Sequence, residues 1–163
     1  MRSKVPRTGD ERSRRVADSL VEMTEIVLPE DTNPRGVVFG GRVLALIDKC
    51  AAVVALRHAQ AEVVTASMDS VDFHSGVRLG HVLVLHGRLN AVFGSSMEIE
   101  VEVHAEEPLT GTRTLTTLAF VTMVAVGPDG PLRVPRLETR GALERKRARA
   151  AAVRRKARLL RRV

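Results

Sequence analysis

The chain has 163 residues, a formal net charge of +7, four phenylalanines, and neither tryptophan nor tyrosine. This length suits one domain, whose core must be built from aliphatic side chains and methionine. The single cysteine, Cys50, excludes an intrachain disulfide and a cysteine-based zinc site, and it fits a reducing, cytoplasmic location. Residues 1–19 lack the apolar run of a signal peptide, and the apolar run over residues 43–56 is too short and too charged to cross a bilayer. Membrane insertion is therefore not expected.

The positive charge is concentrated at the end of the chain. From Arg140 onward eleven basic residues accompany one glutamate, a net charge of +10, so the remainder carries −3. Such a segment could bind nucleic acid or another acidic surface, or remain a solvated helix. No base-stacking aromatic accompanies it, which argues against dedicated single-strand binding. We therefore divide the chain into a flexible charged N-terminal segment (1–19), one domain (20–137) and a basic, helical C-terminal tail (138–163).

In chain order, the hydrophobic pattern predicts one strand, one helix and four further strands. The first strand covers residues 20–28 and ends at Pro29, and the helix covers the apolar run. The later strands are predicted over residues 63–73, 82–92, 96–104 and 112–126. This order favours an α+β fold in which one helix packs against an antiparallel sheet.

One of these strands shows clear alternation of apolar and polar residues. Its polar face carries Glu98, Glu100, Glu102 and His104, which predicts a sheet with one solvated side. A single helix cannot cover both faces and both edges of such a sheet. We therefore expect the polar face and one edge to pair with a second copy of the chain.

The predicted helix carries one carboxylate, Asp48, on its apolar side. At helical spacing Asp48 stacks with small and aliphatic residues such as Leu44 and Ala52. One explanation is structural, because a buried aspartate often only accepts hydrogen bonds from a loop. The other is catalytic, with Asp48 as a general base that activates water or, alternatively, as a nucleophile.

The segment before the helix favours the catalytic explanation. Gly36, Gly40 and Gly41 let backbone approach a ligand closely, and the Gly40-Gly41 pair would open the helix with unpaired N–H groups. Such donors suit an oxyanion, and Asn33 adds an amide that can hold a water or polarise a carbonyl. These glycines match neither the dinucleotide fingerprint nor the phosphate-binding loop.

Together these segments resemble the hot-dog-fold acyl-CoA thioesterases, in the acyl-CoA hydrolase branch of brain-type hydrolases and their single-domain bacterial relatives. The resemblance covers residues 20–137 and neither tail. It is carried by Asp31-Thr32-Asn33, Gly36, Phe39-Gly40-Gly41, Asp48, Val63-Val64-Thr65-Ala66-Ser67, Asp72-Phe73-His74, Gly94-Ser95-Ser96-Met97-Glu98-Ile99, Ala119-Phe120-Val121-Thr122 and Val134-Pro135. The chain departs from the family at His81, where relatives tend to have aspartate.

The resemblance implies a sheet wrapped around one long central helix, paired as double hot-dog dimers and assembled as a trimer of dimers. The implied reaction is hydrolysis of an acyl-CoA to a free fatty acid and CoA, without a metal or other cofactor. Asn33 and Asp48 would form the catalytic pair, contributed by opposite members of a dimer.

The resemblance also implies contacts around that pair. Gly94, Ser95 and Ser96 are similar to the family segment near CoA, although a plain hairpin turn explains them equally well. The hydroxyls of Thr65 and Ser67 are candidates to line the site, with ordinary strand positions as the alternative.

Two other functions stay open. A hot-dog dehydratase or hydratase normally needs a histidine paired with a carboxylate at the helix entrance, and no histidine precedes Asp48. His58 lies about 15 Å beyond Asp48 along the helix, too far for a dyad, and is expected to cap the helix. A non-catalytic acyl-CoA-binding regulator would use its basic tail to contact nucleic acid.

Overall fold

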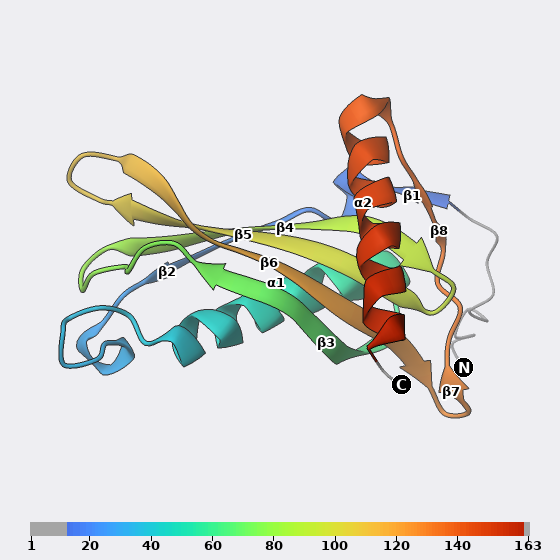
Figure 1. Ribbon diagram of the computed structural model, residues 1–163, viewed down its shortest axis with the longest axis horizontal. Helices are drawn as coiled ribbons and strands as arrows, with labels where there is room; N and C mark the ends of the chain where they lie inside the picture. Colours follow the sequence, from blue (N-terminus) through green and yellow to red (C-terminus); the bar gives the residue numbers. More distant parts are fainter. Residues whose placement is uncertain (1–12, 162–163) are drawn as a thin grey trace, which may run out of the picture.

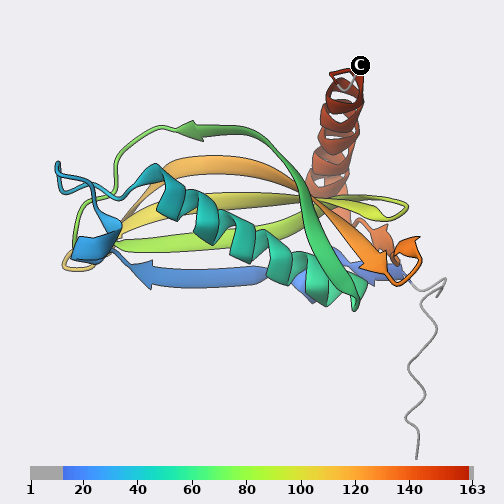
Figure 2. The same ribbon diagram turned by 90° about the horizontal axis from the view of Figure 1, so that it is seen from below.

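The computed structural model describes residues 13–161 of the chain. Its main sheet is antiparallel, with the long strands in the order β2-β4-β5-β6-β3 and the short β7 beside β6. Helix α1 (Gly40–Ala59) lies along one face of this curled sheet, and helix α2 (Gly141–Leu160) stands on the other (Figures 1 and 2). The strands are β2 (Val21–Ile26), β3 (Glu62–Phe73), β4 (Val82–Phe93), β5 (Ser96–Glu107), β6 (Thr112–Gly127) and β7 (Gly130–Pro131). The α+β prediction is confirmed.

Helix α1 is packed into the sheet because apolar residues occupy most of its circumference. The helix lies against Gly87 of β4, where an added Cβ would be 2.8 Å from both Cys50 Sγ and Val54 Cγ2. A side chain at this position would clash with Cys50 and Val54 and force them to move. Burial raises the pKa of the Cys50 thiol to about 11, so Cys50 is an inert core residue, as predicted.

Strand β3 forms one edge of the main sheet. Among the described residues it pairs only with β6, and its register shifts between Thr65 and Ser67 and again between Asp69 and Asp72. An unpaired edge offers backbone N–H and C=O groups to another chain. The edge that was expected to meet a second copy is therefore free in the single chain.

The first described residues pair with the segment that precedes α2. Strand β1 (Ser13–Arg15) pairs in parallel with β8 (Arg136–Glu138), and the 3₁₀ helix η1 (Val16–Ser19) buries Val16 and Ser19. The expectation of a flexible segment is therefore wrong for residues 13–19, while residues 1–12 lie outside the described part. A second 3₁₀ helix, η2 (Pro29–Asp31), follows β2.

No helix between residues 13 and 161 is long and apolar enough to cross a membrane.

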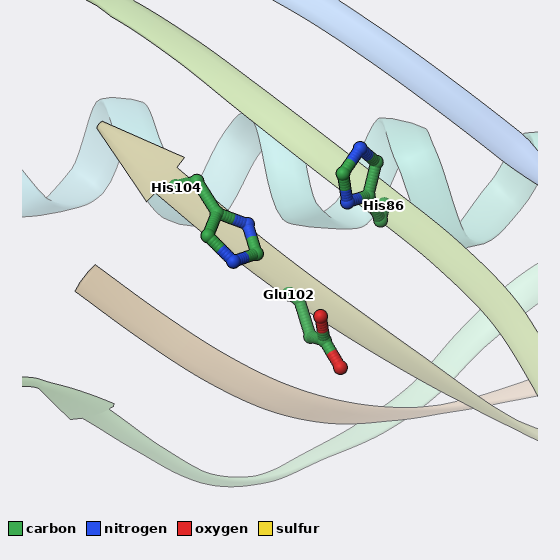
Figure 3. Close-up of side chains that lie close together, drawn as sticks. All are labelled: His86, Glu102 and His104. Atoms are coloured by element: carbon green, nitrogen blue, oxygen red, sulfur yellow. The ribbon is translucent and has the colours of Figure 1, made fainter. Parts of the chain in front are cut away.

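The sheet face opposite α1 carries the polar residues of β5, as their alternation predicted. Glu98 and Glu100 are nevertheless buried, because α2 covers this half of the face. Glu102 and His104 lie on the other half, next to His86 of β4 (Figure 3). The prediction of one wholly solvated face is thus wrong, because a helix of the same chain covers part of it.

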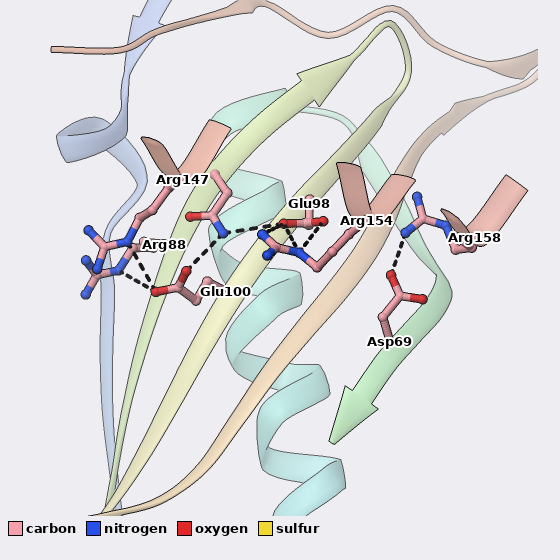
Figure 4. A network of polar contacts seen from close by, with 8 residues as sticks. Asp69, Arg88, Glu98, Glu100, Arg147, Arg154 and Arg158 are labelled. Atoms are coloured by element: carbon pink, nitrogen blue, oxygen red, sulfur yellow. Dashed lines mark hydrogen bonds and ion pairs between the residues drawn. The ribbon is translucent and has the colours of Figure 1, made fainter. Parts of the chain in front are cut away.

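Arginines of α2 hold the helix to this face (Figure 4). Their ion pairs are Arg147 with Glu100 at 3.4 Å, Arg154 with Glu98 at 2.7 Å, and Arg158 with Asp69 at 2.6 Å. The guanidinium of Arg154 also stacks over the Phe120 ring, 3.6 Å from its centroid. The alternative of a solvated tail is therefore wrong for the side of α2 that faces the sheet. Carboxylates of the same chain thus already neutralise these three charges of α2, and Glu138 pairs with Arg140 just before the helix.

Candidate active site

Asp48 and Thr65 are joined by a short hydrogen bond between α1 and β3. The Thr65 hydroxyl donates to Asp48 Oδ1 at 2.6 Å, a length typical of a hydroxyl bound to a carboxylate. The described residues form no hydrogen bond with Asp48 Oδ2, and the side chain is half-buried. The bond orients the carboxylate and leaves one oxygen available to accept a proton from water.

Ser67 does not share this site, because the register shift after Thr65 places the two side chains on opposite faces. Thr65 lies opposite Met123, and its hydroxyl is 3.4 Å from the Met123 sulfur. Ser67 lies opposite Thr122, which in turn pairs with Glu98, the partner of Arg154. Directly opposite residues share a face. Ser67 is thus on the α2 side, and the expectation that it lines the site is wrong.

Asn33 shapes the loop that precedes α1. Its Oδ1 accepts hydrogen bonds from the backbone N–H groups of Arg35 at 3.0 Å and Val37 at 3.3 Å, while Gly36 adopts φ +69°. This arrangement is an Asx turn, which fixes the orientation of the amide. The described residues provide no partner for Nδ2, so Asn33 presents a donor, the group that would polarise a carbonyl.

The N-terminus of α1 presents backbone donors, as the glycine pair predicted. The N–H groups of Arg42 and Val43 both bond to Phe39 O, so those of Gly40 and Gly41 precede the first helical hydrogen bond. Arg42 anchors this end of the helix through ion pairs with Glu25 at 2.6 Å and Asp31 at 2.8 Å. The sequence did not reveal that anchor, because nothing in the spacing of these residues predicts the contact.

These groups form two separate clusters within one chain. One is Asn33 with the N–H groups of Gly40 and Gly41, and the other is Asp48 with Thr65. Gly41 and Asp48 are seven residues apart on α1, about 10 Å along the helix axis. Large apolar side chains beside the start of α1 are exposed, including Phe39 at 63% and Phe73 at 50%. Apolar surface of this kind beside a free strand edge is typical of a protein–protein contact.

The turn between β4 and β5 borders a cavity that Asp48 does not line. Gly94 adopts φ +73°, and the Ser96 hydroxyl donates to Phe93 O at 3.3 Å. The requirements of a hairpin turn therefore account for Gly94 and Ser96 without a ligand. A cavity of about 690 Å³ lies beside it, lined in part by Phe93, Gly94, Arg133 and Arg136. Neither Asn33, Asp48 nor Thr65 lines this cavity. The expected role of Gly94, Ser95 and Ser96 in binding CoA stays a prediction.

His58 is a structural residue of the helix end. It is buried, and its Nε2 lies 2.9 Å from Pro135 O, to which the neutral ring donates. Burial lowers the pKa of His58, which favours that neutral form. This contact ties α1 to the segment before β8, and it agrees with the exclusion of His58 from the site.

Comparison with known proteins identifies the family. The model of the thioesterase superfamily matches residues 35–112. An uncharacterized acyl-CoA thioester hydrolase of Bacillus subtilis is 41% identical over 121 residues, which cover 74% of this chain and 70% of that protein. This chain belongs to the thioesterase superfamily. The cytosolic acyl coenzyme A thioester hydrolase of Rattus norvegicus is 37% identical over 81% of this chain, which spans 35% of that longer protein.

Solved structures of this superfamily confirm the hot-dog fold. A hexameric acyl-CoA thioesterase has a TM-score of 0.88 at 45% identity, covering 93% of this chain and 98% of that chain. The acyl-CoA hydrolase of Staphylococcus aureus, solved with butyryl coenzyme A and coenzyme A, has a TM-score of 0.85 at 33% identity and covers 92% of each chain.

The S. aureus hydrolase has also been solved as three single alanine variants, at an asparagine, an aspartate and a threonine. In that protein the aspartate follows the asparagine by 15 positions and precedes the threonine by 17. Asn33, Asp48 and Thr65 stand at the same two intervals in this chain.

Proposed function

We propose that the protein hydrolyses an acyl-CoA to a free fatty acid and CoA, as an oligomer of identical chains. The observation that carries the proposal is the Asp48 carboxylate, oriented by the Thr65 hydroxyl at 2.6 Å with one oxygen left free. The matching intervals of Asn33, Asp48 and Thr65 support the choice of residues. The names of the relatives support the reaction, and the hexameric relative supports self-association.

The chemistry needs one base and a small set of donors. Asp48 Oδ2 removes a proton from water as the water oxygen attacks the thioester carbonyl carbon, and the carbonyl oxygen becomes negatively charged. Donors at Asn33 Nδ2 and at the Gly40 and Gly41 N–H groups hold that oxygen. The carbon–sulfur bond then breaks, and the proton on Asp48 passes to the departing CoA sulfur. No cofactor takes part in this scheme.

We assign the two clusters of one site to different chains. Asn33 and the start of α1 come from one copy, and Asp48 with Thr65 from another. Within a chain the clusters are separated along α1, and the Asn33 side chain is bonded back into its own loop. A second copy on the exposed apolar surface around Phe39 and Phe73 would bring its clusters opposite these and cover that surface.

The proposal is tested by measuring the thiol released from acyl-CoAs of increasing chain length. Asp48→Asn keeps the shape of the side chain but removes its basicity, so turnover should fall by at least about 10²-fold, the lower range for general-base help. Oligomer mass and CoA binding should not change. The same substitution in an exposed turn, Asp129→Asn, is the matched control.

Each result has a distinct meaning. Near-normal turnover by Asp48→Asn, with conversion back to aspartate excluded by mass, would show that Asp48 is not the base. A wild-type protein that binds CoA but releases no thiol from any acyl-CoA would instead be an acyl-CoA-binding regulator.

We also propose a cytoplasmic location, which the buried thiol of Cys50 and the cytosolic rat relative support.

A further inference from the structure

A cluster of potential metal ligands lies on the open half of the outer sheet face (Figure 3). His86 of β4 and the pair Glu102 and His104 of β5 each offer one ligand atom, and these atoms all lie within 4.8 Å of one another. The register explains the grouping. His86 is directly opposite Glu102, and Glu102 and His104 share a face because they are two residues apart on one strand.

A fourth side chain of the same kind joins the cluster from the next strand. Glu22 of β2 is the register partner of His86, and its Oε2 lies 2.9 Å from His86 Nε2. Three neighbouring strands thus contribute two imidazoles and two carboxylates to one patch. All of them lie across the sheet from α1 and Asp48.

The cluster differs from the carboxylates beside it in how its charge is compensated. Glu98 and Glu100 receive arginines from α2, whereas Glu102 has only Arg88 within ion-pair distance among the described residues, at 3.9 Å. The ring centroids of His86 and His104 are 5.5 Å apart, and the two ring planes are tilted by 49°. His104 Nδ1 is buried and has no hydrogen-bond partner within residues 13–161. A ring nitrogen in that position can be satisfied by a cation ligated from the open side.

We propose that His86, Glu102 and His104 bind one Zn²⁺ or a similar transition metal ion, with Glu22 as a further ligand or as the acceptor that orients His86. Imidazole and carboxylate together suit zinc, whereas magnesium and calcium prefer oxygen ligands alone. Zinc bonds of about 2.0–2.1 Å at tetrahedral angles place ligand atoms about 3.3 Å apart. Because the ligand atoms here lie within 4.8 Å of one another, they must approach by at most about 1.5 Å. Side-chain rotation can supply this movement, because Glu22, His86 and Glu102 are partly exposed.

Such an ion would link β2, β4 and β5 on the face that α2 leaves open. It is separate from the hydrolytic site, since the sheet lies between the cluster and Asp48. Its expected effect is therefore on stability rather than on turnover, because a ligand that binds only the folded state stabilises it by mass action.

The experiment titrates Zn²⁺ into the full-length, metal-stripped oligomer in competition with a chromogenic chelator, and counts bound ions by native mass spectrometry. One ion per chain is expected. Replacing a residue that only orients a metal ligand typically weakens binding by roughly 10–100-fold. His86→Ala and His104→Ala remove ligands and should each weaken Zn²⁺ binding by more than this, whereas Glu22→Gln should weaken it by about tenfold. His81→Ala, in the loop before β4, is the matched control and should bind as the wild type does.

Folding is monitored separately, because removing a partly buried histidine can disturb the sheet. Glu102→Gln keeps the shape of the ligand and should abolish the rise in unfolding midpoint that Zn²⁺ gives the wild type. Asp48→Asn should keep both zinc binding and that rise. The proposal would be overturned if the wild type did not bind one Zn²⁺ per chain. It would also be overturned if Glu102→Gln and His104→Ala bound Zn²⁺ as tightly as the wild type does.

Discussion

Arg154 of α2 covers the carboxylate of Glu98, a residue of the central strand β5 that is 1% exposed. The Arg154 Nε atom contacts both carboxylate oxygens at 3.2 Å, and Nη2 approaches Oε1 at 2.7 Å. A buried carboxylate is costly unless a cation and further donors satisfy it. The helix that carries much of the positive charge of the chain is therefore part of the fold.

Replacing Arg154 by methionine should lower the free energy of unfolding by about 3 kcal/mol, near the lower end of the effect of breaking a buried pair. The reason is that Glu98 would stay buried without its cation, and the contact with Phe120 would be lost. Chemical denaturation measures the effect. Arg149→Met, at an exposed position of the same helix, should change stability little.

Adding Glu98→Gln to Arg154→Met should restore much of the stability, because the buried charge is removed with its partner. A double variant no more stable than Arg154→Met would contradict this account. A chain ending at Thr139 loses Arg147, Arg154 and Arg158 together, so it should be less stable than Arg154→Met.

The buried ring of His58 predicts a dependence of stability on pH. Its pKa in the fold is lowered from about 6.5 by burial, so the unfolded chain takes up the proton first as the pH falls. The full stability is present above pH 6.5 and decreases as the pH falls below that value toward the folded pKa. His58→Gln keeps an N–H donor for Pro135 O but cannot titrate.

Urea denaturation of both proteins between pH 8 and pH 5 checks this prediction. The wild type should lose more stability over this range than His58→Gln. Burial lowers the pKa of His104 as well, so both proteins should keep a common slope and only their difference reports on His58. Identical slopes would show that His58 does not contribute.

The long elements were predictable because each carries its own periodicity. The alternation from Met97 to His104 specifies a strand, and the apolar circumference around Ile47 specifies a buried helix, without any knowledge of the neighbours. The carboxylate that we propose as the base, Asp48, was found in the same way, as a charge at a helical position where apolar residues prevail.

The remaining features depend on contacts distant in sequence. The parallel pairing of Ser13–Arg15 with Arg136–Glu138 involves three residues on each side, too few for a pattern. The position of α2 on the sheet depends on which of its arginines pair with which carboxylates. The sequence composition gives only the number of arginines and carboxylates, not the pairs that they form. The register shift that separates Ser67 from Thr65 arises from pairing with β6, so alternation along β3 alone put both hydroxyls in one site.

Thr65 should contribute to turnover through its bond to Asp48. Thr65→Val keeps the shape of the side chain but removes the donor, so kcat should fall while the KM for acyl-CoA changes little. Thr65→Ser keeps a hydroxyl and should retain more activity. Steady-state kinetics on one acyl-CoA compare the three proteins, and equal kcat values for wild type and Thr65→Val would exclude an orienting role for the hydrogen bond.

The assignment of each site to two chains predicts complementation. Asn33→Ala removes the proposed carbonyl donor and Asp48→Asn removes the base, so oligomers of either variant alone should be almost inactive. After the two proteins are dissociated, mixed and reassembled, some interfaces join an intact Asn33 to an intact Asp48. These interfaces should recover activity in proportion to their frequency, at most about half of the sites in a mixed dimer.

Subunit exchange is verified by placing an affinity tag on one variant and isolating the mixed oligomers before the assay. A second control reassembles Asn33→Ala with a chain that carries both substitutions, which offers no intact pair across any interface and should stay inactive. Recovered thiol release in the first mixture alone identifies sites formed between chains. Mixed oligomers that hydrolyse acyl-CoA no faster than either parent would show that each chain carries a complete site, with its own loop folded back toward Asp48.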